Sequence, residues 1–364
     1  DIYAIPEGTV VFPKEPLVKV IAPVIEAQLV ETAILNIINH QSLIATKAAR
    51  VVHAAQGDGV MEFGLRRAQG PDAGIYGARA SIIAGCIATS NVYSGHKFSI
   101  PVMGTHAHSW IMSFPTELEA FVTYGRLYPN SCILLVDTYD TLKSGVKNAI
   151  RCFDILKQEG IQLGRYGIRM DSGDLAYLSK KAKEMLDNAG YTDAIISASN
   201  DLDEDLISSL KAQGATINSW GVGTKMITAE NQPSFGGVYK LAAIQGKDGE
   251  WIPKIKISEN SEKITNPGNK QIYRIIEKDS GKVFADYIAL EEERFSEAED
   301  LVLFDPIDTW KKSTLKGGSY EMRPLLVPIF LGGKLVYNCP SVEEIKAHCK
   351  KEQESLEKPK RYAT

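Results

Sequence analysis

The chain has 364 residues, of which 44% are hydrophobic and 24% charged, and its formal net charge is −4. This composition is typical of a globular protein long enough for one large domain or two smaller ones. Because the chain has no overall positive charge, it is not expected to bind nucleic acid, and any anionic ligand has to be met by a local group of cations.

The five cysteines lie far apart, are odd in number and form no CxxC motif. This pattern argues against a disulfide framework and a structural zinc site, and it favours a reducing compartment such as the cytoplasm. No apolar run approaches the roughly 20 residues of a membrane span, and no signal-peptide pattern is seen, so we expect no membrane association. The first residues resemble the interior of a domain, so we expect further sequence upstream.

Residues 1–23 contain short strand-like segments separated by turns, and residues 24–56 show helical periodicity. That stretch is long for one helix, so we expect a break near Asn39 and His40. From residue 60, short apolar segments alternate with amphipathic helical patterns. The expected strands are 60–65, 86–90, 98–104, 131–137, 165–170, 194–199 and 217–222, with 238–244 as a candidate eighth. The expected helices are 73–85, 116–127, 141–159, 174–189 and 203–213.

This alternation of strands and helices predicts a parallel sheet. Seven or eight units favour a closed barrel, with an open doubly wound sheet as the alternative. After about residue 245 the segments become strands joined by tight turns, similar to the first 23 residues. We therefore expect an α/β fold in which residues 24–244 form a (β/α) barrel-like domain. Residues 1–23 and 245–364 are expected to form a smaller, mostly antiparallel β domain built from both chain ends, with a charged helix over 341–358.

Polar side chains gather where the expected barrel strands end. In a parallel sheet these ends share one edge, which is where α/β barrels place their chemistry. The edge would hold arginines, carboxylates, histidines and a glycine turn, a combination suited to an anionic, hydroxyl-rich, phosphorylated substrate. The candidate residues are Phe63, Arg66, Ser90, Thr105, His106, His108, Asp137, Arg169, Asp171, Gly223 and Thr224.

Each candidate has an ordinary structural alternative. Two histidines two residues apart, His106 and His108, can serve chemistry or belong to a polar loop, and spacing alone gives both equal weight. The GVGT sequence at 221–224 suits a phosphate because glycines let backbone N–H groups approach it, but a tight turn has the same pattern. An aspartate at a strand end, such as Asp137 or Asp171, can cap a helix, bind ribose hydroxyls or hold magnesium.

The remaining candidates also have ordinary structural alternatives. Arg66 and Arg169 can fork onto a carboxylate or phosphate, or form surface ion pairs, although Arg169 lies between two apolar residues of a strand. Phe63 can stack on a ring or fill the core. Ser90 offers a neutral donor at its strand end.

Several motifs carry a family resemblance. They are EFGLRRAQGPD at 62–72, GTHAHS at 104–109, VDTYDT at 136–141, RMDSGDL at 169–175 and GVGT at 221–224. Further similarity lies in ETAILN at 31–36, ATKAAR at 45–50 and KISENSEK at 256–263. In this order, and over nearly the whole chain, they resemble the nicotinate phosphoribosyltransferase family of type II phosphoribosyltransferases.

The resemblance implies conversion of nicotinate and phosphoribosyl pyrophosphate to nicotinate mononucleotide and pyrophosphate in NAD salvage, coupled to ATP hydrolysis through a phosphohistidine. It further implies Mg²⁺ accompanying ATP and the phosphoribosyl donor, with metal ligands left unassigned, and a homodimer with its active site at the subunit interface. Carried onto matching positions, His108 is the phosphorylated residue, Thr105 and Arg169 hold nicotinate, and Thr224 holds the 5-phosphate. The donor and metal environment would be completed by Arg66, Asp137, Asp171 and Gly223.

Two other functions fit parts of the same pattern. A nicotinamide-specific relative would use an acidic partner for the carboxamide, whereas the end of segment 86–90 offers neutral donors beside arginines. We therefore expect nicotinate to be preferred by orders of magnitude. Quinolinate phosphoribosyl transfer is disfavoured because it has no evident use for a phosphorylatable histidine. A barrel that binds a nucleotide without catalysis is the alternative of another class.

Overall fold

In the computed structural model, residues 1–257, 265–305 and 308–356 are described. Contacts divide the chain into two compact units: Ile38–Phe235, and a unit made of Asp1–Ile37 and Gly236–Thr364. The expected domain boundaries at residues 23 and 245 remain a prediction. Part of the similar segment at 256–263 lies outside the described residues.

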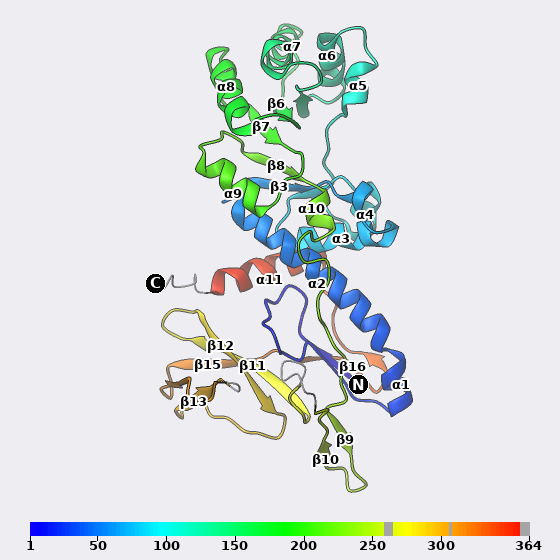
Figure 1. The fold of residues 1–364 in the computed structure, drawn as a ribbon, viewed down its shortest axis with the longest axis vertical. Coiled ribbons are helices and arrows are strands. Elements are labelled where there is room, and N and C mark those ends of the chain that lie inside the picture. Colours follow the sequence, from blue (N-terminus) through cyan, green and yellow to red (C-terminus); the bar gives the residue numbers. More distant parts are fainter. Residues whose placement is uncertain (258–264, 306–307, 357–364) are drawn as a thin grey trace. The chain divides into compact units, whose positions relative to one another are not determined.

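The unit Ile38–Phe235 is built on a six-stranded sheet with the strand order β4-β3-β8-β7-β6-β5 (Figure 1). Every neighbouring pair is parallel, as the alternation of strands and helices predicts. The strands are β3 (Gly59–Glu62), β4 (Ala88–Thr89), β5 (Ser131–Leu135), β6 (Arg165–Met170), β7 (Ile195–Ala198) and β8 (Ser219–Val222).

Helices separate these strands along the chain and bury one apolar face each. Most occupy the positions that periodicity predicts. They are α2 (Glu31–Ala54, shared with the other unit), α3 (Pro71–Ile83), α4 (Val92–Phe98), α5 (His108–Met112), α6 (Glu117–Leu127), α7 (Val146–Gln158), α8 (Leu175–Asn188), α9 (Glu204–Ala212) and α10 (Thr224–Ile227). Single turns of other helix types occur at η1 (Leu65–Arg67) and η2 (Thr141–Gly145).

Three expectations about this region were wrong. Segment 98–104 is no strand of the sheet, because Asn91 caps α4 and the helix continues to Phe98, leaving only a single parallel bridge between Val102 and Thr89. Segment 238–244 does not extend the parallel sheet, because β9 (Ala243–Gln245) pairs antiparallel with β10 (Trp251–Pro253). The described strands therefore form an open six-stranded order rather than a ring of seven or eight.

The third wrong expectation concerns the long helical stretch over residues 24–56. The break falls at Val30, between α1 (Val24–Leu29) and α2, rather than near Asn39 and His40. α2 continues without interruption from Glu31 to Ala54, and its buried side chains lie between Leu43 and Ala54.

The other unit is antiparallel and uses both chain ends, as expected. Its four-stranded sheet has the order β17-β16-β1-β2, and its three-stranded sheet has the order β12-β11-β15. The two-stranded pairs β9–β10 and β13–β14 complete the described strands. Their bounds are β1 (Ile2–Ala4), β2 (Val18–Val20), β11 (Lys270–Glu277), β12 (Val283–Leu290), β13 (Leu301–Phe304), β14 (Lys312–Leu315), β15 (Tyr320–Pro324), β16 (Val327–Leu331) and β17 (Lys334–Leu335).

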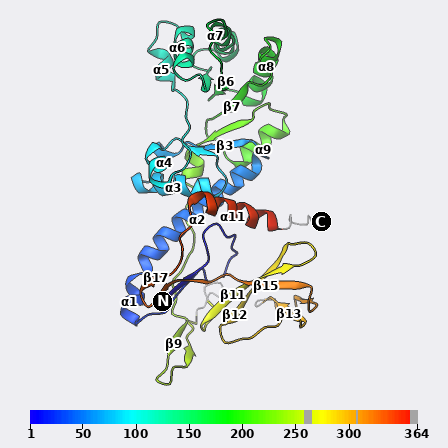
Figure 2. The same cartoon turned by 180° about the vertical axis from the view of Figure 1, so that it is seen from behind.

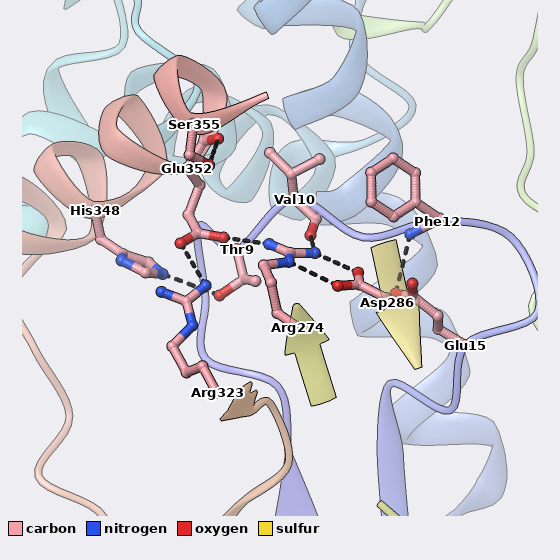
Figure 3. Close-up of polar contacts among 10 residues, drawn as sticks. All are labelled: Thr9, Val10, Phe12, Glu15, Arg274, Asp286, Arg323, His348, Glu352 and Ser355. Carbon is pink, nitrogen blue, oxygen red and sulfur yellow. Dashed lines mark hydrogen bonds and ion pairs between the residues drawn. The ribbon is translucent and has the colours of Figure 1, made fainter. Parts of the chain in front are cut away.

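A buried arginine connects three elements of this unit (Figure 3). Arg274 of β11 is fully buried and donates to both carboxylate oxygens of Asp286 on β12, at 2.9 and 2.5 Å. It also donates to Glu352 of α11 (Val342–Ser355) and to the backbone oxygen of Val10. Glu352 in turn accepts from Arg323 at 2.7 Å. A charge buried this way is stable only because each of its partners is in place.

None of the five cysteines, all of which lie in the described residues, forms a disulfide, and only Cys339 is exposed. Among the described residues, no helix combines the length and the apolar character that crossing a bilayer requires.

Candidate functional site

The carboxyl ends of the parallel strands bring together His108 and two aspartates. Asp137 follows β5, and its Oδ1 lies 3.2 Å from Nε2 of His108, the first residue of α5. Its Oδ2 accepts from the backbone N–H of Asp171 at 2.9 Å and from the hydroxyl of Ser172 at 2.6 Å. The Asp137 side chain is 2% exposed, whereas that of His108 is 40% exposed. A fixed carboxylate therefore orients a histidine that remains accessible.

Asp171 follows β6 and does not cap the next helix, although its position in the sequence made this an alternative. Asp174 caps α8 instead, by accepting from the backbone N–H of Tyr177. The Asp171 Oδ1 accepts a hydrogen bond from the hydroxyl of Ser199, which follows β7. Its Oδ2 has no hydrogen bond within the described residues, so one carboxylate oxygen is open to a ligand.

Arg169 on β6 lies beside Thr105. Its Nη1 donates to Oγ1 of Thr105, whose hydroxyl donates to the backbone oxygen of His106 at 3.2 Å. The buried Nε of Arg169 has no acceptor within the described residues. Burial lowers the pKa of Arg169, although the charges of Asp171 and Asp137 act in the opposite direction. The guanidinium thus keeps N–H groups available to an anion.

His106 differs from His108 because it is buried, with 7% of its surface exposed. Its Nε2 accepts a hydrogen bond from the backbone N–H of Leu135 on β5 at 3.3 Å. Burial, together with the positive charge of Arg169, lowers the pKa of His106 to about 4. The side chain is therefore neutral near pH 7.

Phe63 lies against the glycine turn that follows β8. Its backbone N–H donates to the oxygen of Val222 at 2.8 Å. A Cβ added at Gly221 would lie 2.7 Å from the Phe63 ring, and one at Gly223 would lie 3.0 Å from the Phe63 backbone oxygen. Only glycine permits this approach, which places a half-buried aromatic ring beside the turn that precedes Thr224.

Glu62, the last residue of β3, was missed by the sequence analysis. Its carboxylate is fully buried and accepts from the backbone N–H of Gly64 and from the hydroxyl of Thr89 at 2.6 Å. Burial raises its pKa. Its backbone oxygen accepts from the N–H of Ser90 at 2.9 Å, so it joins the loops after β3 and β4. The only signal in the sequence was an acidic residue ending an apolar strand.

Hydrogen bonds link some of the predicted residues and leave others apart. His108, Asp137 and Asp171 form one group, and Thr105 contacts Arg169. Arg66 lies exposed in η1 and has no ion pair within the described residues. Neither it nor Ser90 or Thr224 contacts these groups through a side chain, and all these site assignments stay predictions.

The arrangement also bears on metal binding. No group of three or more His, Cys, Asp or Glu side chains among the described residues could enclose a metal ion. Both oxygens of Asp137 accept hydrogen bonds, whereas one oxygen of Asp171 accepts none from the described residues. Such a donor set fits Mg²⁺, which commonly binds one or two carboxylates together with substrate phosphates.

The sequence matches two family models. The nicotinate phosphoribosyltransferase (NAPRTase) family matches residues 59–273, and the nicotinate phosphoribosyltransferase C-terminal domain matches residues 269–363. The chain belongs to the nicotinate phosphoribosyltransferase family. It is 47% identical to the nicotinate phosphoribosyltransferase of Bacillus subtilis (strain 168) over 367 residues, which cover 99% of this chain and 74% of that protein. The human nicotinate phosphoribosyltransferase is 31% identical over 398 residues, covering 94% and 72%.

A solved structure agrees with the nicotinate phosphoribosyltransferase assignment. The crystal structure of human nicotinic acid phosphoribosyltransferase has a TM-score of 0.83 and 29% identity, covering 98% of this chain and 76% of that one. The combination of a parallel sheet with antiparallel sheets from both chain ends is therefore the fold of this family. The structure of a nicotinate-nucleotide pyrophosphorylase from Pyrococcus furiosus, with a TM-score of 0.74 and 23% identity, shares the fold.

Proposed function

We propose that this protein converts nicotinate and phosphoribosyl pyrophosphate to nicotinate mononucleotide and pyrophosphate, as a salvage step of NAD biosynthesis. ATP hydrolysis through a phosphohistidine at His108 would drive the reaction. Family membership supports the transfer reaction. The observation that carries the coupled mechanism is an accessible His108 whose Nε2 is held by the buried carboxylate of Asp137.

Arg169 and Thr105 are the proposed nicotinate contacts. A guanidinium matches a carboxylate in charge and in geometry, and the Nε of Arg169 is buried with no acceptor among the described residues. The half-buried ring of Phe63 offers a surface on which a pyridine ring can stack. A carboxamide has no negative charge to pair with the buried guanidinium of Arg169, so nicotinate is the preferred base.

The phosphohistidine step follows from the orientation of His108. With Nε2–H donating to Asp137, the lone pair lies on Nδ1. The bond from Nδ1 to the γ-phosphorus of ATP forms as the bond to the ADP oxygen breaks. Asp137 stabilises the imidazolium. Water later cleaves the N–P bond and releases phosphate.

The donor would bind at the other strand ends. Displacement at the anomeric carbon needs positioning, charge neutralisation of pyrophosphate and exclusion of water rather than a protein nucleophile. Gly223 and Thr224 are the proposed contacts of the 5-phosphate, and Arg66 is a free cation for the pyrophosphate. Mg²⁺ bound with the pyrophosphate would neutralise part of its charge, and Asp171 is its proposed protein ligand.

A homodimer that shares its active site across the interface is proposed from the family resemblance alone. Light scattering measures the assembly.

The test of the function is steady-state turnover of both bases. We expect nicotinate mononucleotide and pyrophosphate in equal amounts from nicotinate, and turnover of nicotinamide lower by orders of magnitude. Arg169→Met should raise the KM for nicotinate by about 100-fold, because a charge-assisted bidentate contact contributes roughly 3 kcal/mol. Arg151→Met, at an exposed position of α7, is the control.

Comparable turnover of both bases would contradict the assignment of nicotinate. Nucleotide binding without release of pyrophosphate would instead support the non-catalytic alternative.

A further inference from the structure

The segment 101–107 joins the two outer strands of the parallel sheet. Val102 forms a bridge with Thr89 of β4, and the N–H of Met103 donates to the Thr89 oxygen at 3.0 Å. Four residues beyond Val102, Nε2 of His106 accepts from the N–H of Leu135 on β5. β4 and β5 are the ends of the strand order, and Figures 1 and 2 show the chain between α4 and α5 passing from one end of the sheet to the other.

The His106 imidazole packs against two aromatic side chains, and its buried Nδ1 has no hydrogen-bond partner among the described residues. Its ring lies 4.6 Å from that of Tyr124 and 6.1 Å from that of Phe121, measured between centroids, and both aromatic rings belong to α6. Because Nε2 accepts a hydrogen bond, the ring proton resides on Nδ1. The Leu135 N–H is at the outer edge of β5, where the described residues provide no strand to pair with it.

The two residues assigned to substrates flank His106. Thr105 donates a hydrogen bond to the backbone oxygen of His106 and accepts one from Arg169. His108, two residues after His106, is hydrogen-bonded to Asp137. A shift of His106 would therefore move both contacts at once.

We propose that His106 is a positioning residue for nicotinate and for His108. By accepting the Leu135 N–H, its imidazole fixes segment 104–108 on β5 and holds Thr105 against Arg169 and His108 against Asp137. This inference rests on the proposed function and deepens it. The simpler alternative is a histidine that only fills space beneath α6, for which the acceptor atom would not matter.

The experiment separates these two roles by the position of the acceptor. In His106→Gln the amide oxygen reaches the place of Nε2, whereas in His106→Asn it reaches only the place of Nδ1. Backbone amide exchange at Leu135 is measured by NMR, together with the amide shifts of Thr105 and His108. The KM values for nicotinate and for phosphoribosyl pyrophosphate are then measured for each variant. His40→Asn on α2 is the control, since His40 is a half-buried histidine whose Nε2, unlike that of His106, has no hydrogen-bond partner among the described residues.

We expect His106→Asn to speed exchange at Leu135, shift the Thr105 and His108 amides and raise the KM for nicotinate about tenfold, the effect of one lost buried hydrogen bond. The KM for the phosphoribosyl donor should change by less than about twofold, because none of its proposed contacts lies in segment 104–108. His106→Gln should recover most of each loss, and His40→Asn should leave all four readouts unchanged.

Equal behaviour of the Gln and Asn variants, or slow Leu135 exchange in both, would overturn the proposal. If the wild-type protein turned over no nicotinate, the proposed function would fail. The amide measurements would still decide whether His106 positions its neighbours, because they need no turnover.

Discussion

At the scale of single residues, the site depends on Asp137. Its two oxygens accept from His108, from the Asp171 backbone and from Ser172, so one buried carboxylate sets the orientation of the histidine and the path of the loop after β6. None of these donors can be replaced by water without loss, because the carboxylate is enclosed. The oxygen that faces His108 also selects its tautomer.

Replacing this carboxylate by an amide reverses the tautomer. In Asp137→Asn the amide oxygen can serve Asp171 and Ser172, which turns the NH₂ group toward His108 and makes Nε2 the acceptor. The proton then lies on Nδ1, which can no longer attack phosphorus. We expect formation of phosphohistidine, followed by rapid quench, to slow by roughly 10³- to 10⁴-fold, as in other sites where the wrong histidine tautomer is imposed.

The control is Asp174→Asn, which alters the exposed N-cap of α8 and preserves a good capping residue. It should phosphorylate at the wild-type rate. A normal rate in Asp137→Asn would show that Asp137 does not orient the histidine.

The buried His106 predicts a pH dependence of stability. Its pKa is about 4 in the folded protein, against 6.5 for an exposed histidine, because burial opposes the charged form. The unfolded chain therefore binds more protons between these values, and stability is lost as pH falls from 6.5 toward 4. The shift corresponds to about 3 kcal/mol at most. Urea unfolding at pH 7 and pH 4.5 should show a smaller decline in His106→Gln than in the wild type, and an equal decline would contradict this assignment.

At the scale of elements, the antiparallel unit depends on one cross-link between secondary-structure elements. Arg274 joins β11 to β12 through Asp286 and to α11 through Glu352 (Figure 3). Beside them, the pKa of Glu15 is raised to about 8, by burial and by its hydrogen bond to Asp286. Glu15, Asp286 and Glu352 surround the single buried cation of Arg274, and a proton on Glu15 removes one negative charge from this cluster.

Removing the cation leaves these carboxylates buried without a partner. We expect Arg274→Leu to lower the free energy of unfolding by about 3–5 kcal/mol, because the partners lose compensation while their desolvation remains. Urea denaturation of the full chain measures the change. Lys311→Leu removes an exposed ion pair with Asp308 in the same unit and should have no measurable effect. A loss no larger than that of Lys311→Leu would show that the cluster does not stabilise the unit.

At the scale of the whole molecule, the sequence predicts elements better than it predicts their partners. Buried parallel strands appear as short apolar runs, so β5, β6, β7 and β8 fall inside predicted segments. Segment 98–104 has the same composition but forms no strand: α4 ends at Phe98, Ser99 is its left-handed C-cap, and only Val102 forms a bridge.

Pairings between distant segments could not be predicted. Nothing in the local pattern shows that β3 pairs with β8, which is more than 150 residues away along the chain. The strand-end rule predicted that His108, Asp137 and Asp171 lie at one edge, and hydrogen bonds link these three residues. It could not show that Asp137 accepts from three donors, that Glu62 joins two loops or that His106 accepts from the Leu135 N–H of β5, because each is a tertiary contact.

The measurement that most directly tests the proposed mechanism is incubation of the protein with γ-labelled ATP, followed by mapping of the acid-labile, base-stable phosphate. The orientation of His108 by Asp137 predicts label on His108 alone. In His108→Ala, we expect neither label nor ATP stimulation, while slow uncoupled transfer to nicotinate survives. Label on another residue, or ATP coupling that persists in His108→Ala, would contradict the phosphohistidine mechanism.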